Sequence, residues 1–267
     1  MKKLYKVILI CFITTSAIAQ DVVVIDDSKK KEGKVALVIL NGFGDSKKNR
    51  KKQKKFFENK GYDLYIPEYI KRKSIDKSIE TFSLFYKNQE LSKYKEVKFL
   101  CYIIGGYVLN QYIEQNGKEN ISTVIYDRSP TQERAPQTAV KKLPLLSRLM
   151  YGKVLKDFSL REKENLSEDK GLSIGVIIEN KATKLMRMYR KTADSYGEYT
   201  YDAYDIEPNL DDYFHTILDH DLMYIRFDII GKEILYFLEN GVFTSEAKRT
   251  PYDWDPFKKL KKNDFNL

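Results

Sequence analysis

Apolar and polar stretches alternate along the chain in a regular order. Short runs of continuous apolar residues, typical of strands buried on both faces, end in turns that carry glycine or polar residues. Segments with apolar positions three and four residues apart, typical of helices, follow most of these turns. The predicted strands are 35–40, 62–66, 97–103, 122–126, 172–178 and 213–218, and the predicted helices include 47–60, 75–86 and 229–238.

Strands that alternate with helices are normally joined by right-handed crossovers, which places successive strands parallel to one another. The alternation therefore predicts an α/β fold with a mostly parallel central sheet and helices on both faces. We expect a signal peptide at 1–19, a polar lead at 20–34, one domain at 35–243 and a polar C-terminal extension at 244–267.

The composition supports a packed domain and leaves the partner open. The chain has 267 residues, of which 42% are hydrophobic, so it is not a wholly disordered polypeptide. Its formal net charge of +9 comes mostly from lysine and does not identify a nucleic-acid binder. The dense basic run at 47–55 is followed by no nucleic-acid motif, and we interpret it as a solvated helix face.

The first twenty residues have the pattern of an export signal. Lys2, Lys3 and Lys6 precede a short apolar run and the small-residue motif Ala17-Ile18-Ala19. The apolar run is too short for a bilayer, which takes about 20 residues, so we expect no transmembrane anchor. The pattern predicts export to the periplasm or the cell exterior. Cys101 would then be the one cysteine left, and it could form no internal disulfide.

Three motifs share the spacing of a known superfamily. They are the early loop Asn41-Gly42-Phe43-Gly44, the strand-to-helix turn that ends in Gly105-Gly106, and Asp219-His220-Asp221-Leu222-Met223 after the last strand. With these motifs the chain resembles the α/β-hydrolase superfamily, particularly its small lipase and esterase-like members, over about 35–243. The resemblance implies a nucleophile, an acid and a histidine on loops at the carboxyl edge of the sheet.

The nucleophile of the family stands at the tip of a Gly-x-Ser-x-Gly turn. Aligned on Gly105-Gly106, the serine position is occupied by Ile103 and the first glycine by Cys101. Isoleucine has no nucleophilic atom, and its branched side chain makes a strained elbow costly, which predicts an ordinary strand-to-helix connection. Cys101 is an alternative thiol nucleophile, although a small buried residue is the more common interpretation of a free cysteine.

The resemblance also implies positions for the acid and the base. It puts the acid in a loop after the strand at 172–178, where Tyr196 stands in its place and Asp194 is an alternative acid. It puts the base at His220, the triad member that we expect to be retained. Both the nucleophile and the acid positions are therefore degenerate.

A second histidine raises the question of a metal site. His215 lies five residues before His220, so on one strand the two imidazoles would face opposite sides of the sheet. This spacing disfavours a metal site built from the two histidines with Asp219 and Asp221. We therefore predict neither a metal nor a cofactor.

The oxyanion loop works through backbone amides, which most substitutions leave in place. In the resemblance Asn41, Gly42, Phe43 and Ile104 line this loop and its pocket, so a binding pocket could outlast the chemistry. The segment 143–152 is similar to the lid-like helix of these proteins and has the alternative interpretation of an ordinary helix packed on the sheet.

Three functions follow from these residues. The leading hypothesis is an exported protein that has lost serine-hydrolase activity and binds a small apolar ligand, an envelope component or a protein. The alternative is an esterase or lipase-like hydrolase with a rearranged site, which uses Cys101 or a water activated by His220 with Asp194 or Asp219. The third is a scaffold without a ligand.

Overall fold

The computed structural model describes residues 21–161 and 171–259, so the predicted signal peptide lies outside the described residues. Its sheet has seven strands in the order β1-β3-β2-β4-β5-β6-β7. Strand β1 pairs antiparallel with β3, and the other pairs are parallel, which confirms the mostly parallel sheet. The strands are β1 (Val22–Val24), β2 (Val35–Leu40), β3 (Asp63–Ile66), β4 (Glu96–Tyr102), β5 (Ile121–Arg128), β6 (Ser173–Lys181) and β7 (Asp212–Asp219).

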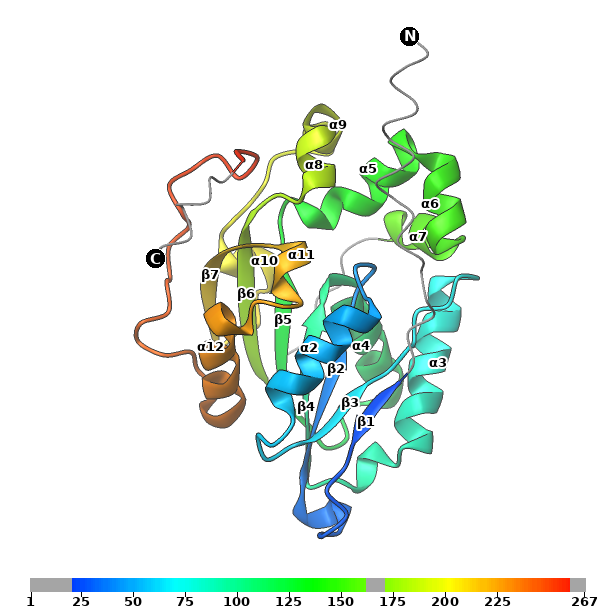
Figure 1. The fold of residues 1–267 in the computed structure, drawn as a ribbon, viewed down its shortest axis with the longest axis vertical. Coiled ribbons are helices and arrows are strands. Elements are labelled where there is room, and N and C mark those ends of the chain that lie inside the picture. Colours follow the sequence, from blue (N-terminus) through cyan, green and yellow to red (C-terminus); the bar gives the residue numbers. More distant parts are fainter. Residues whose placement is uncertain (1–20, 162–170, 260–267) are drawn as a thin grey trace.

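The predicted helices cover both faces of this sheet (Figure 1). One face packs against α3 (Ile75–Asn88) and α4 (Ile103–Asn116), whose aromatic and aliphatic side chains form one core cluster with β2 to β6. The other face packs against α2 (Lys47–Phe57), α11 (His220–Met223) and α12 (Phe227–Asn240), which form a second cluster. Each strand therefore contributes alternate side chains to two separate cores.

A group of short helices lies beyond the carboxyl ends of the strands, at the top of Figure 1. These cap helices are α5 (Ala135–Lys142), α6 (Pro144–Tyr151), α7 (Val154–Ser159), α8 (Lys184–Met188) and α9 (Arg190–Asp194). Arg72 donates hydrogen bonds to the carbonyls of Leu149 and Met150, and Ser147 donates to the Ala139 carbonyl at 3.0 Å. These bonds fix α6 against α5 and against the loop that follows β3.

The two flanking segments also contact the sheet. Within the predicted polar lead, Val22–Val24 form the edge strand β1, which is too short to stand out as an apolar run. In the C-terminal segment, the Trp254 indole donates to the Asn180 carbonyl at 2.9 Å, and the Ala182 amide donates to the Pro256 carbonyl at 3.0 Å. This segment thus packs against the end of β6.

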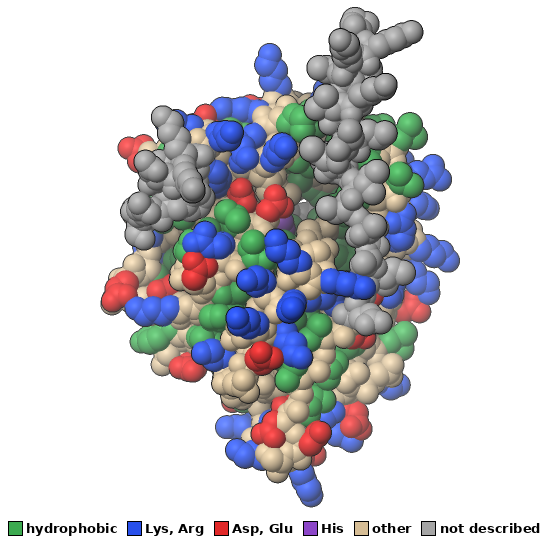
Figure 2. Space-filling model, viewed as in Figure 1, with side chains coloured by type: hydrophobic (Ala, Val, Ile, Leu, Met, Phe, Trp, Pro, Cys, Tyr) green, Lys and Arg blue, Asp and Glu red, His purple; other side chains and the backbone are tan. Residues whose placement is uncertain are grey.

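The basic run forms helix α2, as predicted, and most of its lysines are exposed. Figure 2 shows these cations as a blue patch over the position of α2. Arg50 is the exception because it is buried and forms an ion pair with Asp45. In the part of the chain that the structure describes, no helix combines the length and the apolar character needed to cross a bilayer.

Candidate active site at the carboxyl edge of the sheet

The connection from β4 to α4 is an ordinary strand-to-helix turn. Positive φ angles of described non-glycine residues occur at Asn59, Glu90 and Glu119, so Ile103 does not adopt the strained conformation of a nucleophile elbow. A Cβ atom on Gly105 would lie 2.2 Å from the Leu40 carbonyl oxygen, which no side chain tolerates. The glycine is therefore required for close packing of α4 on β2, whether or not a nucleophile is present.

Cys101 does not supply the missing nucleophile. Its side chain is fully buried in the core cluster on the α4 face, whereas the neighbouring Tyr102 packs in the cluster on the opposite face. Burial raises the pKa of the Cys101 thiol well above its usual value. The thiol therefore stays protonated at neutral pH and is a weak nucleophile.

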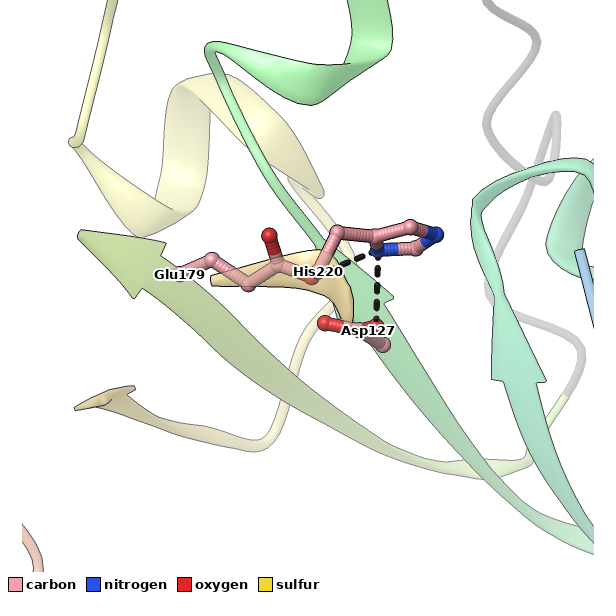
Figure 3. A group of neighbouring side chains, drawn as sticks. All are labelled: Asp127, Glu179 and His220. Atoms are coloured by element: carbon pink, nitrogen blue, oxygen red, sulfur yellow. Dashed lines mark hydrogen bonds and ion pairs between the residues drawn. The ribbon is translucent and has the colours of Figure 1, made fainter. Parts of the chain in front are cut away.

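His220 lies at the start of α11, directly after β7, where the motif predicts it. Asp219 caps this helix by accepting a hydrogen bond from the Leu222 amide at 3.2 Å. The His220 ring is buried, and its Nδ1 lies 2.7 Å from Glu179 Oε1 and 3.5 Å from Asp127 Oδ2 (Figure 3). Because a carboxylate oxygen accepts hydrogen bonds, Nδ1–H is the donor to Glu179.

The two carboxylates come from neighbouring parallel strands. Asp127 lies near the end of β5 and Glu179 near the end of β6, and both side chains are completely buried. Burial by itself lowers the pKa of His220, but the attraction of Glu179 and Asp127 is stronger and raises this pKa well above its usual value. Burial, and then repulsion by Asp127, raise the pKa of Glu179 well above its usual value.

The acid position differs from the one predicted. Tyr196 lies at the cap, where its hydroxyl donates to the Gln137 carbonyl at 3.3 Å. Asp194 accepts a hydrogen bond from Tyr199 at 2.9 Å and pairs with Arg190. The carboxylates that the structure places beside His220 are therefore Glu179 and Asp127, and neither comes from the loop at 194–197. Asp219, the other predicted partner of His220, serves as the helix cap.

Tyr224 closes the site from the opposite side of the imidazole. Its hydroxyl lies 3.2 Å from His220 Nε2 and accepts a hydrogen bond from the Gly42 amide at 3.1 Å. The Tyr224 hydroxyl therefore joins the imidazole of His220 to the loop at Gly42. The Tyr224 ring is fully buried and stacks on Tyr102 with 4.2 Å between ring centroids.

The phenol of Tyr224 is held in its neutral form. Burial, and then the charges of neighbouring groups that include Asp127, raise the pKa of Tyr224 well above its usual value. Tyr224 therefore fills the space beside the imidazole with a protonated hydroxyl.

The loop predicted to bind an oxyanion is held in place from several directions. The side-chain amide nitrogen of Asn41 (Nδ2) donates to the Asp45 carboxylate at 3.0 Å and to the side-chain oxygen of Gln53 at 2.9 Å. The ring of Phe43 contacts Tyr151 and Phe158 of the cap, at centroid distances of 5.3 and 5.9 Å.

The backbone amide of this loop is already occupied. A Cβ atom on Gly42 would lie 2.9 Å from the Tyr224 hydroxyl, 3.6 Å from Ile104 Cγ2 and 3.7 Å from His220 Nε2. Gly42 and Ile104, two residues of the predicted oxyanion loop and pocket, therefore lie beside His220, and the Tyr224 hydroxyl contacts both Gly42 and His220.

The other histidine has different partners. His215 Nδ1 lies 2.9 Å from the side-chain amide of Asn180, and burial, followed by the charge of Lys248, lowers the pKa of His215 to about 4. His215 and His220 therefore share no hydrogen-bond partner among the described residues.

A polar pocket of about 240 Å³ lies between α5 and the loop that follows α9. Its lining includes Pro130, Arg134, Tyr196 and Ile206. Arg134 donates to the carbonyls of Ala193, Gly197 and Glu198, which closes one wall of the cavity. The predicted acid position Tyr196 therefore belongs to this cavity.

Comparison with known proteins supports the fold. No protein-family model and no curated protein sequence matches the chain. Among solved structures, the chain is similar to an alpha/beta hydrolase fold protein from Chitinophaga pinensis, with 12% identity and a TM-score of 0.52, over 84% of this chain and 98% of that one. It is also similar to Est1E from Butyrivibrio proteoclasticus, with 7% identity and a TM-score of 0.52, over 84% of this chain and 99% of that one.

A third similar structure is a bromoperoxidase from Bacillus anthracis, with 14% identity and a TM-score of 0.50, over 78% of this chain and 92% of that one. Identities this low establish the architecture and leave the activity open. The sheet order, the position of His220 after the last strand and these structural neighbours together show that the chain has the α/β-hydrolase fold.

Proposed function

We propose that this chain is an exported α/β-hydrolase-fold protein that has lost serine-hydrolase chemistry and binds an anionic lipid surface through its cap. The observation that carries the loss of chemistry is the place of the Tyr224 hydroxyl. It lies between His220 Nε2, where a nucleophile would be deprotonated, and the Gly42 amide, where a substrate oxygen would be stabilised.

The nucleophile position supports the same proposal. Ile103 offers no reactive atom, and the Cys101 thiol is buried, protonated and on the other face of the sheet from Tyr102. An acyl-transfer reaction needs a nucleophile within hydrogen-bond reach of the base and an empty space for the carbonyl oxygen. The hydroxyl within reach of the base is that of Tyr224, and it also accepts from the Gly42 amide, so it occupies the space that the carbonyl oxygen would need.

The binding surface is argued from helix α6. Leu145 and Leu149 are 84% and 73% exposed, and their spacing of four residues puts them on one face of the helix. Arg148 lies on this face as well, because it is three residues from Leu145. Exposed leucines of this kind are costly in water and typical of a helix that lies in a membrane interface.

The positive charge around these leucines favours a negatively charged lipid surface. The exposed cations between residues 135 and 161 are Lys141, Lys142, Arg148, Lys153, Lys156 and Arg161. Asp157 is the one acidic residue in the same segment. Each lysine or arginine near an anionic membrane contributes about 1 kcal/mol of attraction. Apolar side chains surrounded by cations therefore match anionic lipid headgroups above an acyl layer.

The binding proposal is tested by co-sedimentation with phosphatidylglycerol vesicles and with neutral phosphatidylcholine vesicles. We expect binding to the anionic vesicles, weakened at least tenfold by Leu145→Asp/Leu149→Asp or by Lys141→Glu/Lys142→Glu. The matched controls are Leu84→Asp on α3, where the leucine is 52% exposed, and Lys51→Glu/Lys52→Glu on α2. Equal binding to both vesicles, or loss of binding only in the α2 variant, would show that the cap is not the binding surface.

Export is tested by the mass of the protein found outside the cytoplasm. We propose cleavage after Ala19, so that the mature chain begins at Gln20. An uncleaved chain confined to the cytoplasm would contradict this part of the proposal.

The loss of chemistry is tested with esters of short and medium acyl chains. We expect the purified protein to hydrolyse them no faster than buffer, and His220→Ala to leave the rate unchanged. Turnover that His220→Ala abolishes would refute the proposal.

The second candidate function is a hydrolase with a rearranged site, and the pair formed by His220 and Glu179 favours it. This pair has the arrangement that a general base requires, with a carboxylate on Nδ1. A movement of Tyr224 would give Nε2 access to a water molecule. Ester turnover that persists in Cys101→Ala and disappears in His220→Ala would support this candidate over the first.

A further inference from the structure

Two buried carboxylates and the imidazole of His220 form a cluster that the proposed lipid binding does not use. Asp127, Glu179 and His220 each offer one ligand atom, and these atoms all lie within 4.8 Å of one another. Figure 3 shows both carboxylates directed at the same ring nitrogen, from two neighbouring strands. The opposite ring nitrogen points away from them, toward Tyr224.

The cluster has more acceptors than donors. Both oxygens of Asp127 and the Oε2 atom of Glu179 are buried and accept no hydrogen bond. The ion pairs of these two carboxylates within the described part of the chain are with His220. One imidazole therefore faces two carboxylates. A buried carboxylate without a full set of partners costs free energy, and a bound cation offsets that cost.

We propose that Asp127, Glu179 and His220 bind a divalent metal ion of the zinc or manganese type. Two carboxylate oxygens and an imidazole nitrogen are ligands that these ions accept. For ligand atoms about 2.1 Å from an ion, neighbouring ligands lie about 3.0 to 3.4 Å apart. The observed separations from His220 Nδ1, 2.7 Å to Glu179 and 3.5 Å to Asp127, lie on either side of that range.

Metal binding changes the protonation of one group. Nδ1 must give its proton to solvent before it can ligate the ion, and the remaining proton then resides on Nε2. The Nε2–H donates to the Tyr224 hydroxyl, which lies 3.2 Å away and fixes the orientation of the ring. Because the ligands come from β5, β6 and α11, the ion would join the ends of two strands to the following helix. The proposal does not depend on lipid binding.

The experiment measures metal uptake by the full-length protein after treatment with a chelator. We expect one equivalent of zinc or manganese by elemental analysis, and a rise in the melting temperature of several degrees when the metal is added. Cobalt(II) provides a second readout, because a four-coordinate or five-coordinate site gives visible absorption bands that free cobalt lacks. Magnesium at the same concentration is expected to have a weaker effect.

Two conservative variants test the ligands. Asp127→Asn and Glu179→Gln keep the shape of the side chain and are expected to lower metal affinity at least tenfold and to weaken the cobalt bands. Glu133→Gln is the matched control, because Glu133 is a buried carboxylate that pairs with Arg128 outside the cluster. We expect this variant to bind metal like the original chain.

The titration of the unaltered protein decides the proposal even if a variant fails to fold. Absence of stoichiometric metal, together with an unchanged melting temperature, would overturn it. A melting temperature that rises equally in Asp127→Asn would also overturn it, because the metal would then bind elsewhere. Stabilisation by Asp127→Asn without any metal uptake would show that the cluster is only a pair of crowded carboxylates.

Discussion

The two ends of the candidate site are held by different interactions. At the turn from β4 to α4, the glycines remain while the nucleophile position holds Ile103. At the opposite end, His220 remains with a carboxylate on Nδ1, and Tyr224 occupies Nε2. Close packing accounts for the glycines at one end, and hydrogen bonds hold the imidazole and Tyr224 at the other. Neither requirement needs a reaction.

The turn is expected to show the larger effect on stability. Gly105→Ala puts a Cβ atom 2.2 Å from the Leu40 carbonyl oxygen, and helix α4 must move away from β2. We expect a loss of about 3 kcal/mol in the free energy of unfolding, measured by urea denaturation. Gly33→Ala is the control, since a Cβ there meets nothing within 4 Å. Equal stability of the two variants would show that close packing does not explain the glycine.

The histidine end is expected to show the next largest effect. Tyr224→Phe removes one hydroxyl and leaves both the Gly42 amide and His220 Nε2 without their buried partner. We expect this variant to lose about 2 kcal/mol of stability in the same denaturation experiment. Tyr204→Phe, at a tyrosine that is 59% exposed, is the control and is expected to have no measurable effect. A fully stable Tyr224→Phe would mean that this network does not stabilise the site.

His215 is expected to have a smaller effect, which is a decrease in the stability of the folded chain at acid pH. The pKa of His215 is lowered to about 4 in the folded chain, so between its usual value of 6.5 and about 4 the unfolded state binds a proton that the folded state does not. The contribution of His215 to the free energy of unfolding is therefore fully present above pH 6.5. It is lost as the pH falls to about 4, which lowers the stability by roughly 1 to 2 kcal/mol. His215→Gln should flatten this part of the stability curve. An unchanged slope in the variant would assign the decrease to other groups.

The sequence predicts the sheet better than the cap. Each long apolar run became a strand within one to three residues of its predicted bounds, because burial on both faces needs continuous apolar side chains. At the end of β4 the difference concerns the candidate site, because Ile103 begins helix α4 and does not end the strand. The helix expected at 143–152 is present as α6, but the cap helices are only five to eight residues long, and most of these short segments have too few turns to show a clear helical period.

The candidate site was predicted in part. His220 and the loop at Asn41 to Phe43 follow from motifs with fixed spacing. Glu179 was missed because the acid was sought in a loop, whereas it lies inside β6 directly after Ile177 and Ile178. A charged residue at the end of a buried apolar strand is the signal that would have found it, and Asp127 carries the same signal in β5.

Tyr224 carried no signal in the sequence. Its role depends on the hydrogen bond from the Gly42 amide, and Gly42 lies 182 residues earlier in the chain. Contacts at such a separation follow from the packing of α11 on the sheet and cannot be read from a local pattern.

The most direct test of the central claim is covalent labelling of the purified protein with a fluorophosphonate, followed by measurement of the intact mass. This reagent reacts with a nucleophile activated by a neighbouring imidazole. Because Tyr224 occupies His220 Nε2 and no reactive atom stands at Ile103, we predict an unchanged mass after prolonged incubation. A single adduct that peptide mapping places beside His220 would contradict the account.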